Sequence, residues 1–303
     1  MKAIARALDS DFAYSFRRSP VAVFSGLIVL VLGLGAFLAP WIAPHNPFDV
    51  ATLNLMNSFM PPVPAADSNA SFLLGTDDQG RDILSAIMFG TRLSLFVGFL
   101  AIIFSLAVGI GVGLLAGYAG GATDAVLMRV ADVQLTFPSI LIALLVDGVV
   151  QALLPRQYHD QLSLYVIIFA IGIARWPQFA RTVRGSTLVE RGRDYVMAAR
   201  VIGIPSWRIM LSHILPNVLG PMLVIATLSL GLAILDEATL SFLGVGLPPT
   251  QPSLGTLIRI GNDFLFSGEW WVTVFPGITL ALMVLAINLL GDWLRDALNP
   301  RLR

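Results

Sequence analysis

Residues 181–217 read RTVRGSTLVERGRDYVMAARVIGIPSWRIMLSHILPN and are the most polar and basic part of a largely apolar chain. Asp194 is suited to a helix N-cap, and Gly203 is suited to the left-handed residue that follows a helix end. Pro205 is suited to the first turn of a second helix. The stretch therefore predicts two short helices, 194–203 and 205–216, that meet at a tight corner.

The first of these two helices carries the adjacent small residues Ala198 and Ala199. Small side chains leave a flat face that another surface can approach closely. The same spacing also fits a capped helical hairpin that only links two membrane spans, so spacing alone leaves both interpretations open. In either case we expect substitution of an exposed charge such as Arg191 to have only a mild effect on function.

The composition of the chain identifies its class. Of 303 residues, 56% are hydrophobic and 13% are charged, and the mean hydropathy is +0.80. Soluble domains carry about 25% charged residues, so the chain is a polytopic membrane protein. The net charge is zero, which gives no indication of a nucleic-acid partner. The absence of cysteine excludes disulfides, thiolate metal sites and a cysteine nucleophile.

Six apolar runs are long enough to cross a hydrocarbon layer of about 30 Å. The first is too long for a typical signal peptide and is predicted to be an uncleaved anchor. Pro138 should kink the third run. The group 175–177 should end the fourth at the membrane surface, and Trp270 with Trp271 should anchor the sixth there. The runs are residues 21–42, 93–115, 125–150, 162–179, 218–240 and 270–290.

The distribution of basic residues orients these spans. With the N-terminus inside, the 19 Lys and Arg residues divide 15 to 4 in favour of the inner side. Residues 1–19 and 294–303 are then cytoplasmic tails, and 20–92 hold the first span and a long outer loop. Residues 93–293 form the membrane core, with a cytoplasmic loop at 181–216. Both termini are predicted to be cytoplasmic.

The densest motif of the outer loop is GTDDQGRD at residues 75–82. Its carboxylates, Asp77, Asp78 and Asp82, could hold a metal. Adjacent carboxylates in a turn more typically cap the chain and face water, and we predict that role here. Residues 83–91, which follow, predict a short amphipathic helix at the membrane interface.

The second apolar run contains Gly109, Gly113 and Gly117 at intervals of four. This spacing predicts a ridge of small residues on which another helix packs closely. It does not predict a nucleotide-binding loop, because no strand pattern precedes it. The only lysine of the chain is Lys2, so a Walker A lysine is absent and the chain is not a P-loop ATPase.

Four ionisable residues in or near the apolar runs are candidates for a polar pathway: Asp132, Asp147, Asp236 and Glu237. Charged groups inside a membrane are costly, and they usually face protein or water. Asp132 could instead pair with Arg129, one helical turn earlier. Asp236 and Glu237 could instead mark the water boundary.

Other functional classes find less support in the sequence. It contains no HExxH or GxSxG motif, and its three histidines form no plausible base–nucleophile set, which argues against an intramembrane hydrolase. A stand-alone secondary transporter or channel is the alternative function. Many such carriers contain internal repeats with broken helices, and the two halves of this chain show no convincing repeat.

Four motifs occur in an order that resembles one family. They are GTDDQGRD at 75–82, the loop pattern of Ala198, Ala199 and Gly203 before Leu215–Pro216, LSFLGVG at 240–246, and GDWLRDALNP at 291–300. Together they resemble the permease subunits of the dipeptide, oligopeptide and nickel family of bacterial ABC importers. The long first outer loop is similar to that of the C-type subunit. Met197 departs from the family pattern, which often has Glu there, and His213 departs where the family often has Ile.

The resemblance implies an all-α polytopic fold with six transmembrane helices and a cytoplasmic EAA-like coupling loop, the type I ABC importer permease fold. It implies a non-catalytic inner-membrane subunit that, with a second permease subunit, forms a pathway for peptides or a related small solute. Two cytoplasmic ABC ATPases would bind ATP and magnesium, and an extracytoplasmic binding protein would deliver the solute. No cofactor or metal is expected in this chain. The residues implied in ATPase docking are Ala198, Ala199, Gly203, Ile204 and Pro205.

Overall fold

The computed structural model describes residues 11–49, 53–248 and 250–297, and these form a bundle of helices. Predictions that fall on residues 1–10 and 298–303, including the end of the last motif, lie outside the described residues. The α-helices are α2 Asp11–Arg18, α3 Pro20–Ile42, α4 Ile83–Ala119, α5 Gly121–Leu135, α6 Ser139–Leu153, α7 His159–Glu190, α8 Asp194–Val201, α9 Ser206–Arg208, α10 Leu215–Phe242, α11 Leu254–Asn262 and α12 Trp271–Ala297. Short 3₁₀ turns are η2 Leu55–Asn57, η3 Arg156–Tyr158 and η5 Leu265–Ser267, and η4 Ile209–Ile214 is a π-helical segment.

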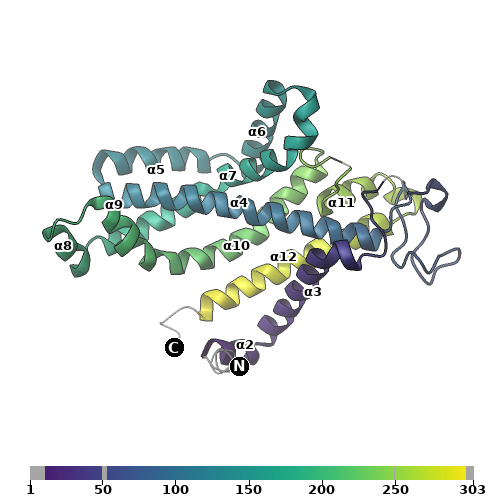
Figure 1. Cartoon of the computed structure of the whole chain (residues 1–303), viewed down its shortest axis with the longest axis horizontal. Coiled ribbons are helices and arrows are strands. Elements are labelled where there is room, and N and C mark those ends of the chain that lie inside the picture. Colours follow the sequence, from purple (N-terminus) through teal and green to yellow (C-terminus); the bar gives the residue numbers. More distant parts are fainter. Residues whose placement is uncertain (1–10, 50–52, 249, 298–303) are drawn as a thin grey trace.

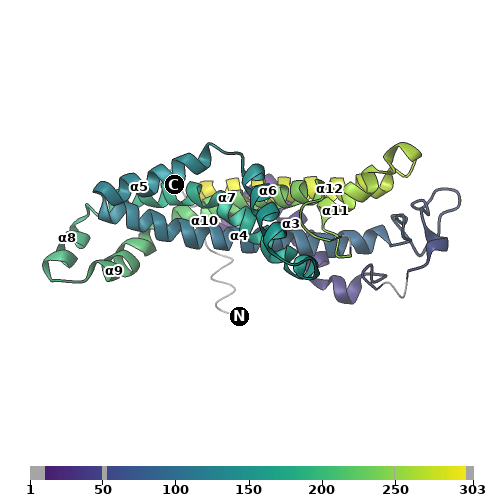
Figure 2. The same cartoon turned by 90° about the horizontal axis from the view of Figure 1, so that it is seen from above.

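The described residues contain 5 helices long and apolar enough to cross a membrane, and a sixth span if the bent pair α5 and α6 is counted as one. The prediction of six apolar spans is therefore confirmed if the third span is counted as the broken pair α5 and α6. The bundle is elongated, with α8 and α9 at one end and the loop before α4 at the other (Figure 1). A view turned by 90° keeps these two segments at opposite ends (Figure 2).

The most extensive helix pair is α4 with α7. It forms along the predicted glycine ridge, where a Cβ on Gly113 would lie 2.6 Å from the Ala180 carbonyl oxygen. A Cβ on Gly117 would lie 2.7 Å from the Thr187 Cβ. Such distances are too short for a side chain, so glycine is what lets the two backbones approach. The predicted packing ridge is confirmed.

Two helices are longer than the apolar runs predict. Helix α4 begins at Ile83, so the predicted interfacial helix 83–91 is its first part. Asp82 caps it and accepts a hydrogen bond from the Ser85 N–H at 2.9 Å. Helix α7 continues to Glu190 instead of ending near 179. Apolar runs mark the lipid-crossing part of a helix, whereas helix length also depends on protein contacts beyond the lipid.

The extension of α7 corrects two predictions about its residues. Arg175 and Trp176 are each 6% exposed and lie within the helix, so they do not form an interfacial group. Residues 181–190 are helical, so the first part of the predicted loop 181–216 belongs to α7. The extension is held in place because Val183 and Thr187 are buried and Arg184 pairs with a carboxylate of α5.

The third predicted span is broken where a kink was expected. Helices α5 and α6 are bent by 93° relative to one another. Phe137 precedes Pro138, and a residue before proline is pushed out of the helical region. The break places α6 at a steep angle to the long axis of the bundle, with its inner face on α7 (Figure 1).

The outer loop is built around Asp77, which caps the chain as predicted. The prediction that these carboxylates face water is wrong for Asp77 and Asp82, which are 0% and 2% exposed. Its Oδ1 accepts the backbone N–H groups of Gln79 and Arg81 at 2.9 Å each, and the Arg81 Nε donates to its Oδ2 at 2.6 Å. The buried Trp271 donates its indole N–H to the Thr76 carbonyl at 3.0 Å, which joins the loop to α12. Trp271 is thus a packing residue, and the predicted interfacial role is left to Trp270, which is 45% exposed. In the described ranges no group of acidic or histidine side chains could hold a metal ion.

Candidate functional site

The corner between α8 and α9 has the geometry of a Schellman helix end. The Ile204 N–H donates to the Ala199 carbonyl at 3.0 Å, and the Gly203 N–H donates to the Arg200 carbonyl at 3.1 Å. Gly203 lies at φ +79°, in the left-handed region that favours glycine. The predicted glycine turn is therefore present.

The helices on either side of this corner differ from the predicted ones. Asp194 is the first helical residue, and the N-cap position before it is Arg193, which makes no side-chain capping bond. Pro205 precedes α9 instead of lying in its first turn. The second helix does not end at Pro216, because α9, η4 and α10 run on as one element, Ser206–Phe242. The membrane span thus begins directly after the corner.

Burial divides the residues predicted to dock a partner. Ala199 is 3% exposed and packs into the core of this chain together with Val196, and the half-buried Ile204 packs against the same core. Ala198, Gly203 and Pro205 are exposed. The predicted flat alanine face is therefore wrong in one respect: Ala198 faces outward, whereas Ala199 supports the corner from inside.

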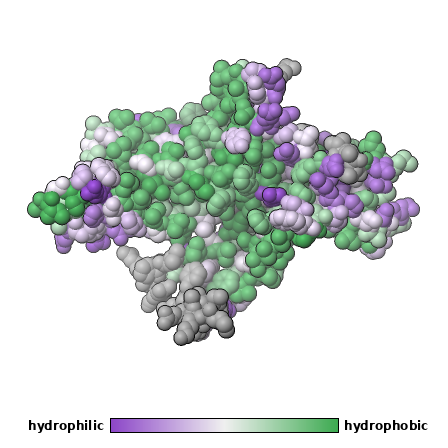
Figure 3. All heavy atoms as spheres, in the orientation of Figure 1, coloured by the Kyte–Doolittle hydropathy of each residue, from purple (hydrophilic) through white to green (hydrophobic). Residues whose placement is uncertain are grey.

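An exposed apolar surface covers the end of the molecule at this corner, and the sequence interpretation missed it. Val201 is 87% exposed, Ile202 75%, Trp207 57% and Met197 48%. We call these four residues and Ala198 the tip patch. Apolar colouring reaches the extreme end of the molecule over α8 (Figure 3). The available signal was a set of apolar residues within the most basic stretch of the chain. Contiguous exposed apolar surface typically marks an interaction site.

Polar contacts join the corner to the ends of the long helices. The Tyr195 hydroxyl donates to Glu190 Oε2 at 2.5 Å, and the Asn217 side-chain amide donates to the same hydroxyl at 3.0 Å. Burial raises the pKa of Tyr195, and the hydrogen bond to Glu190 raises it further. Because Glu190 ends α7 and Asn217 lies at the start of α10, α8 is fixed between the two helices.

Two arginines extend this attachment to α4. Arg191 Nη1 donates to the Gly117 carbonyl at 2.9 Å, and the Arg200 guanidinium lies 4.9 Å from the ring centroid of Tyr118. Arg191 was predicted to be an exposed charge of little consequence, and that prediction is wrong. Its guanidinium satisfies a carbonyl at the C-terminal end of α4, where helix carbonyls lack partners.

The four polar residues proposed for a pathway do not converge. Asp132 Oδ1 lies 3.7 Å from Arg181 Nη1 of α7, and both side chains are largely exposed, so its partner is not Arg129. Asp236 Oδ2 lies 2.6 Å from Arg175 Nη2 in a mostly buried ion pair that joins α10 to α7.

Glu237 faces a different side of α10 from its neighbour Asp236. It is 0% exposed, so the prediction that it marks the water boundary is wrong. The Ser94 hydroxyl of α4 donates to its Oε2 at 2.6 Å, and the Ser241 hydroxyl donates to its Oε1 at 2.8 Å. One pair of adjacent acids thus ties α10 to two different helices.

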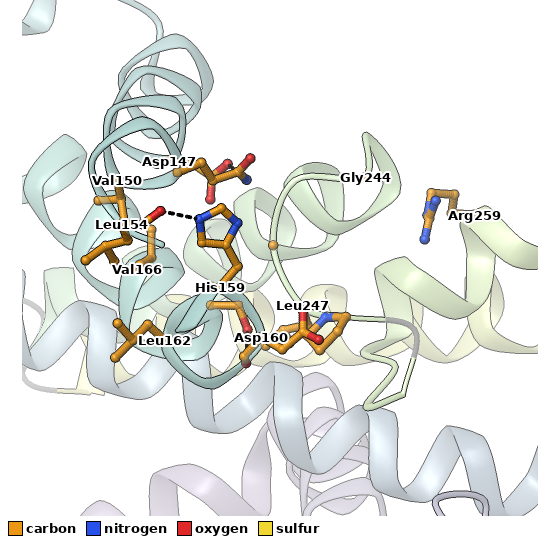
Figure 4. A pocket seen from close by; sticks show the side chains of 14 residues that line it. Asp147, Val150, Leu154, His159, Asp160, Leu162, Val166, Gly244, Leu247 and Arg259 are labelled. Atoms are coloured by element: carbon orange, nitrogen blue, oxygen red, sulfur yellow. Dashed lines mark hydrogen bonds between the residues drawn. The ribbon is translucent and has the colours of Figure 1, made fainter. Parts of the chain in front are cut away.

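Asp147 is the member of the four that lines a pocket. The pocket has a volume of about 260 Å³ and lies between α6, the start of α7, the loop 244–248 and α11 (Figure 4). The Gln151 amide donates to Asp147 Oδ2 at 2.5 Å, and His159 Nε2 is 2.9 Å from the Leu154 carbonyl oxygen. Asp160 and Arg259 also line it.

Two family models match the chain. The description of the first is "Binding-protein-dependent transport system inner membrane component", and it matches residues 109–303. The second is described as the N-terminal TM domain of oligopeptide transport permease C and matches residues 10–62.

Curated relatives match over nearly the whole chain. The dipeptide transport system permease protein DppC of Escherichia coli K12 is 41% identical over 293 residues, which cover 97% of this chain and 93% of that protein. DppC of Haemophilus influenzae is 38% identical over 293 residues, covering 97% and 95%. The glutathione transport system permease protein GsiD of Pectobacterium atrosepticum is 37% identical over 297 residues, covering 97% and 91%.

Among solved structures, an inward-facing MetNI methionine ABC transporter superposes with a TM-score of 0.54 at 20% identity. The match covers 71% of this chain and 96% of that chain. At this identity the likeness shows a shared fold.

Proposed function

The chain belongs to the family of binding-protein-dependent transport system inner membrane components, and from this membership we propose that it carries short peptides across the membrane together with a second permease subunit. As a member it is a multi-pass inner-membrane permease subunit of an ABC importer. The relatives named for dipeptides and for glutathione support a peptide-sized solute.

The proposed partners are those of a binding-protein-dependent importer. Family membership supports two cytoplasmic ABC ATPases that bind ATP and magnesium, and this chain, with the single lysine Lys2, has no Walker A lysine of its own. A solute-binding protein delivers the peptide from outside. The arginine distribution supports a cytoplasmic location for both termini and for the corner after α8. The proposed division is a tail at 1–19, an anchor and outer loop at 20–92, a core at 93–293 and a tail at 294–303.

The observation that supports ATPase docking is the tip patch. Its apolar side chains lie at the water-facing end of the bundle, where α7 ends and the element Ser206–Phe242 begins. An ATPase groove that covers it would remove this surface from water. The docking surface then includes Ala198, Gly203 and Pro205, while Ala199 and Ile204 hold the corner in shape.

Docking at this corner gives a direct mechanical connection. Glu190 and Asn217 belong to two membrane-crossing helices and meet at Tyr195 of α8. A movement of α8 with the ATPases is therefore transmitted to both helices. Coupling requires that ATP and the loaded binding protein each bind one state of the pathway more tightly than the other.

Reconstitution of the purified subunits in lipid vesicles tests the proposal. We expect uptake of a radiolabelled dipeptide only when ATP, the ATPases, the second permease subunit and the binding protein are all present. Uptake by this chain alone, driven by an ion gradient, would instead support a stand-alone transporter. Reporter fusions at Asn69 and Arg191 test the orientation, and we expect them outside and inside respectively.

A further inference from the structure

The pocket that contains Asp147 combines charges of both signs beside the end of α10. Its walls carry the carboxylates of Asp147 and Asp160, the imidazole of His159 and the guanidinium of Arg259 (Figure 4). Asp147 is near the end of α6, and Asp160 is in the first turn of α7. Arg259 approaches from α11, on the other side of the loop 244–248.

We propose that this pocket binds both charged ends of a zwitterionic short peptide during its passage. The ammonium group would lie at Asp147, and the carboxylate would lie at Arg259. The proposal rests on the proposed import of peptides and adds the place in this subunit where the peptide is recognised.

Arg259 provides the first argument. Its Nε is buried and has no hydrogen-bond partner among the described residues. A buried donor without a partner is costly. A carboxylate that accepts from Nε and one Nη in a bidentate pair would satisfy it, and such charge-assisted pairs are the strongest hydrogen bonds that arginine makes.

The wall between the two charged sides provides the second argument. Gly244 and Gly246 lie at φ +82° and +141°, conformations that side-chain-bearing residues rarely adopt. A Cβ on Gly244 would lie 3.8 Å from Arg259 Nη1. Gly244 therefore keeps a side chain away from Arg259, on a wall that Leu247 and Pro248 also line.

Size and position agree with a small ligand. The volume of about 260 Å³ is below the roughly 300–1,000 Å³ of pockets that enclose drug-sized molecules, and suits a peptide of few residues. The pocket lies at the end of α6 and beyond the end of α10, far along the chain from the tip patch. With the orientation given by the arginines, a peptide released outside reaches this pocket early in its passage.

The experiment uses the fact that the chain contains no cysteine. A single cysteine, Ser163→Cys, is placed in the pocket wall, and the complete importer is assembled with its permease, ATPase and binding-protein partners in lipid vesicles. The rate of modification by a small methanethiosulfonate reagent is measured with and without millimolar dialanine. We expect dialanine to slow the labelling, and N-acetyl-dialanine amide, which lacks both charges, to leave it unchanged.

Two further variants give the matched controls. Adding Arg259→Gln to the cysteine variant should raise the dialanine concentration for half-protection by about tenfold or more, because a charge-assisted contact is lost. Leu145→Cys lies on the exposed side of α6, where the side chain is 67% exposed, and its labelling should not respond to dialanine.

Three results would overturn the proposal: no protection by dialanine, equal protection by the blocked peptide, or a cysteine at 163 that the reagent never reaches in the assembled importer. Uptake by the same vesicles is measured in parallel. Uptake without protection would contradict only the proposed peptide pocket, whereas protection without peptide uptake would contradict the proposed function.

Discussion

The two ends of the molecule differ in the kind of side chain that each buries and exposes. At the outer end, the loop before α4 buries an ion pair: Asp77 is 0% exposed and Arg81 2%. At the other end, α8 and α9 leave apolar side chains exposed, with Ile202 75% exposed. The Asp77–Arg81 pair has both of its members in this chain. The tip patch is covered by a partner only in the proposed complex, and substitutions at the two ends are therefore expected to fail in different assays.

The largest effect is expected at the outer end, from Asp77→Ala. The change leaves the buried Arg81 guanidinium without its closest acid and removes two backbone acceptor contacts. Breaking a buried ion pair costs about 3–5 kcal/mol. Thermal unfolding of the detergent-purified chain should show a large loss of stability. An unchanged melting temperature would mean that the loop does not depend on this centre.

Asp78→Ala is the matched control for that change. Asp78 is 29% exposed and lies 3.8 Å from Arg81 Nη2. Burial, and next the charge of Asp77, raise the pKa of Asp78, which means that its surroundings disfavour the charged form. Removing it should therefore cost much less than removing Asp77, although the two residues are adjacent.

The next effect is expected at the tip patch, from Ile202→Asp. A charge placed at the centre of an apolar docking surface should weaken ATPase binding by about 2 kcal/mol or more, roughly thirtyfold. The stability of the chain should not change, because the Ile202 side chain is largely exposed and packs little against the rest of the chain. Co-purification of the ATPases and thermal unfolding are measured together. Ser212→Asp, at an exposed position outside the patch, is the control. Normal co-purification with Ile202→Asp would mean that the patch is not the docking surface.

A smaller effect at the outer half of the bundle is expected from Glu237→Ala. The change leaves the buried hydroxyls of Ser94 and Ser241 without their acceptor, which costs about 1–3 kcal/mol. Glu237→Gln keeps one acceptor oxygen and should lose less. Thermal unfolding is the measurement, and ATPase co-purification should be normal for both variants. Equal losses for Ala and Gln would show that the hydrogen bonds are not what stabilises this site.

The features that the sequence predicted are those set by local chemistry. The glycine ridge on α4 follows from residue spacing, and the left-handed turn at Gly203 follows from the backbone freedom of one residue. The outward direction of Ala198 and the inward direction of Ala199 could not be predicted, because they depend on how α8 rolls against the start of the next span. The continuation of α7 past its apolar run likewise depends on distant contacts.

The polar residues show the same limit. Asp236 and Glu237 are adjacent in sequence and looked equivalent, yet one pairs with α7 and the other with α4. A step of one residue turns a helix by about 100°, so their surroundings are set by different neighbours. The tip patch was visible as apolar residues in a basic stretch. Its exposure became clear only when the buried side of α8 was known.

The smallest effect is expected at Gly203. A substitution there tests the backbone conformation separately from side-chain contacts. A Cβ there would meet no atom within 4 Å, so Gly203→Ala introduces no clash within the chain. What it introduces is a left-handed conformation at φ +79° that costs a residue with a side chain about 1 kcal/mol. Asparagine tolerates this conformation better than alanine does, so Gly203→Asn should retain more dipeptide uptake than Gly203→Ala in spite of its larger side chain. Uptake in vesicles and hydrogen exchange over residues 195–210 are the measurements, and Gly220→Ala, at an exposed glycine of α10 with ordinary helical backbone, is the control. If loss of uptake instead followed side-chain size, with Asn worse than Ala, contact with the partner and not backbone strain would be the reason that glycine stands at this corner.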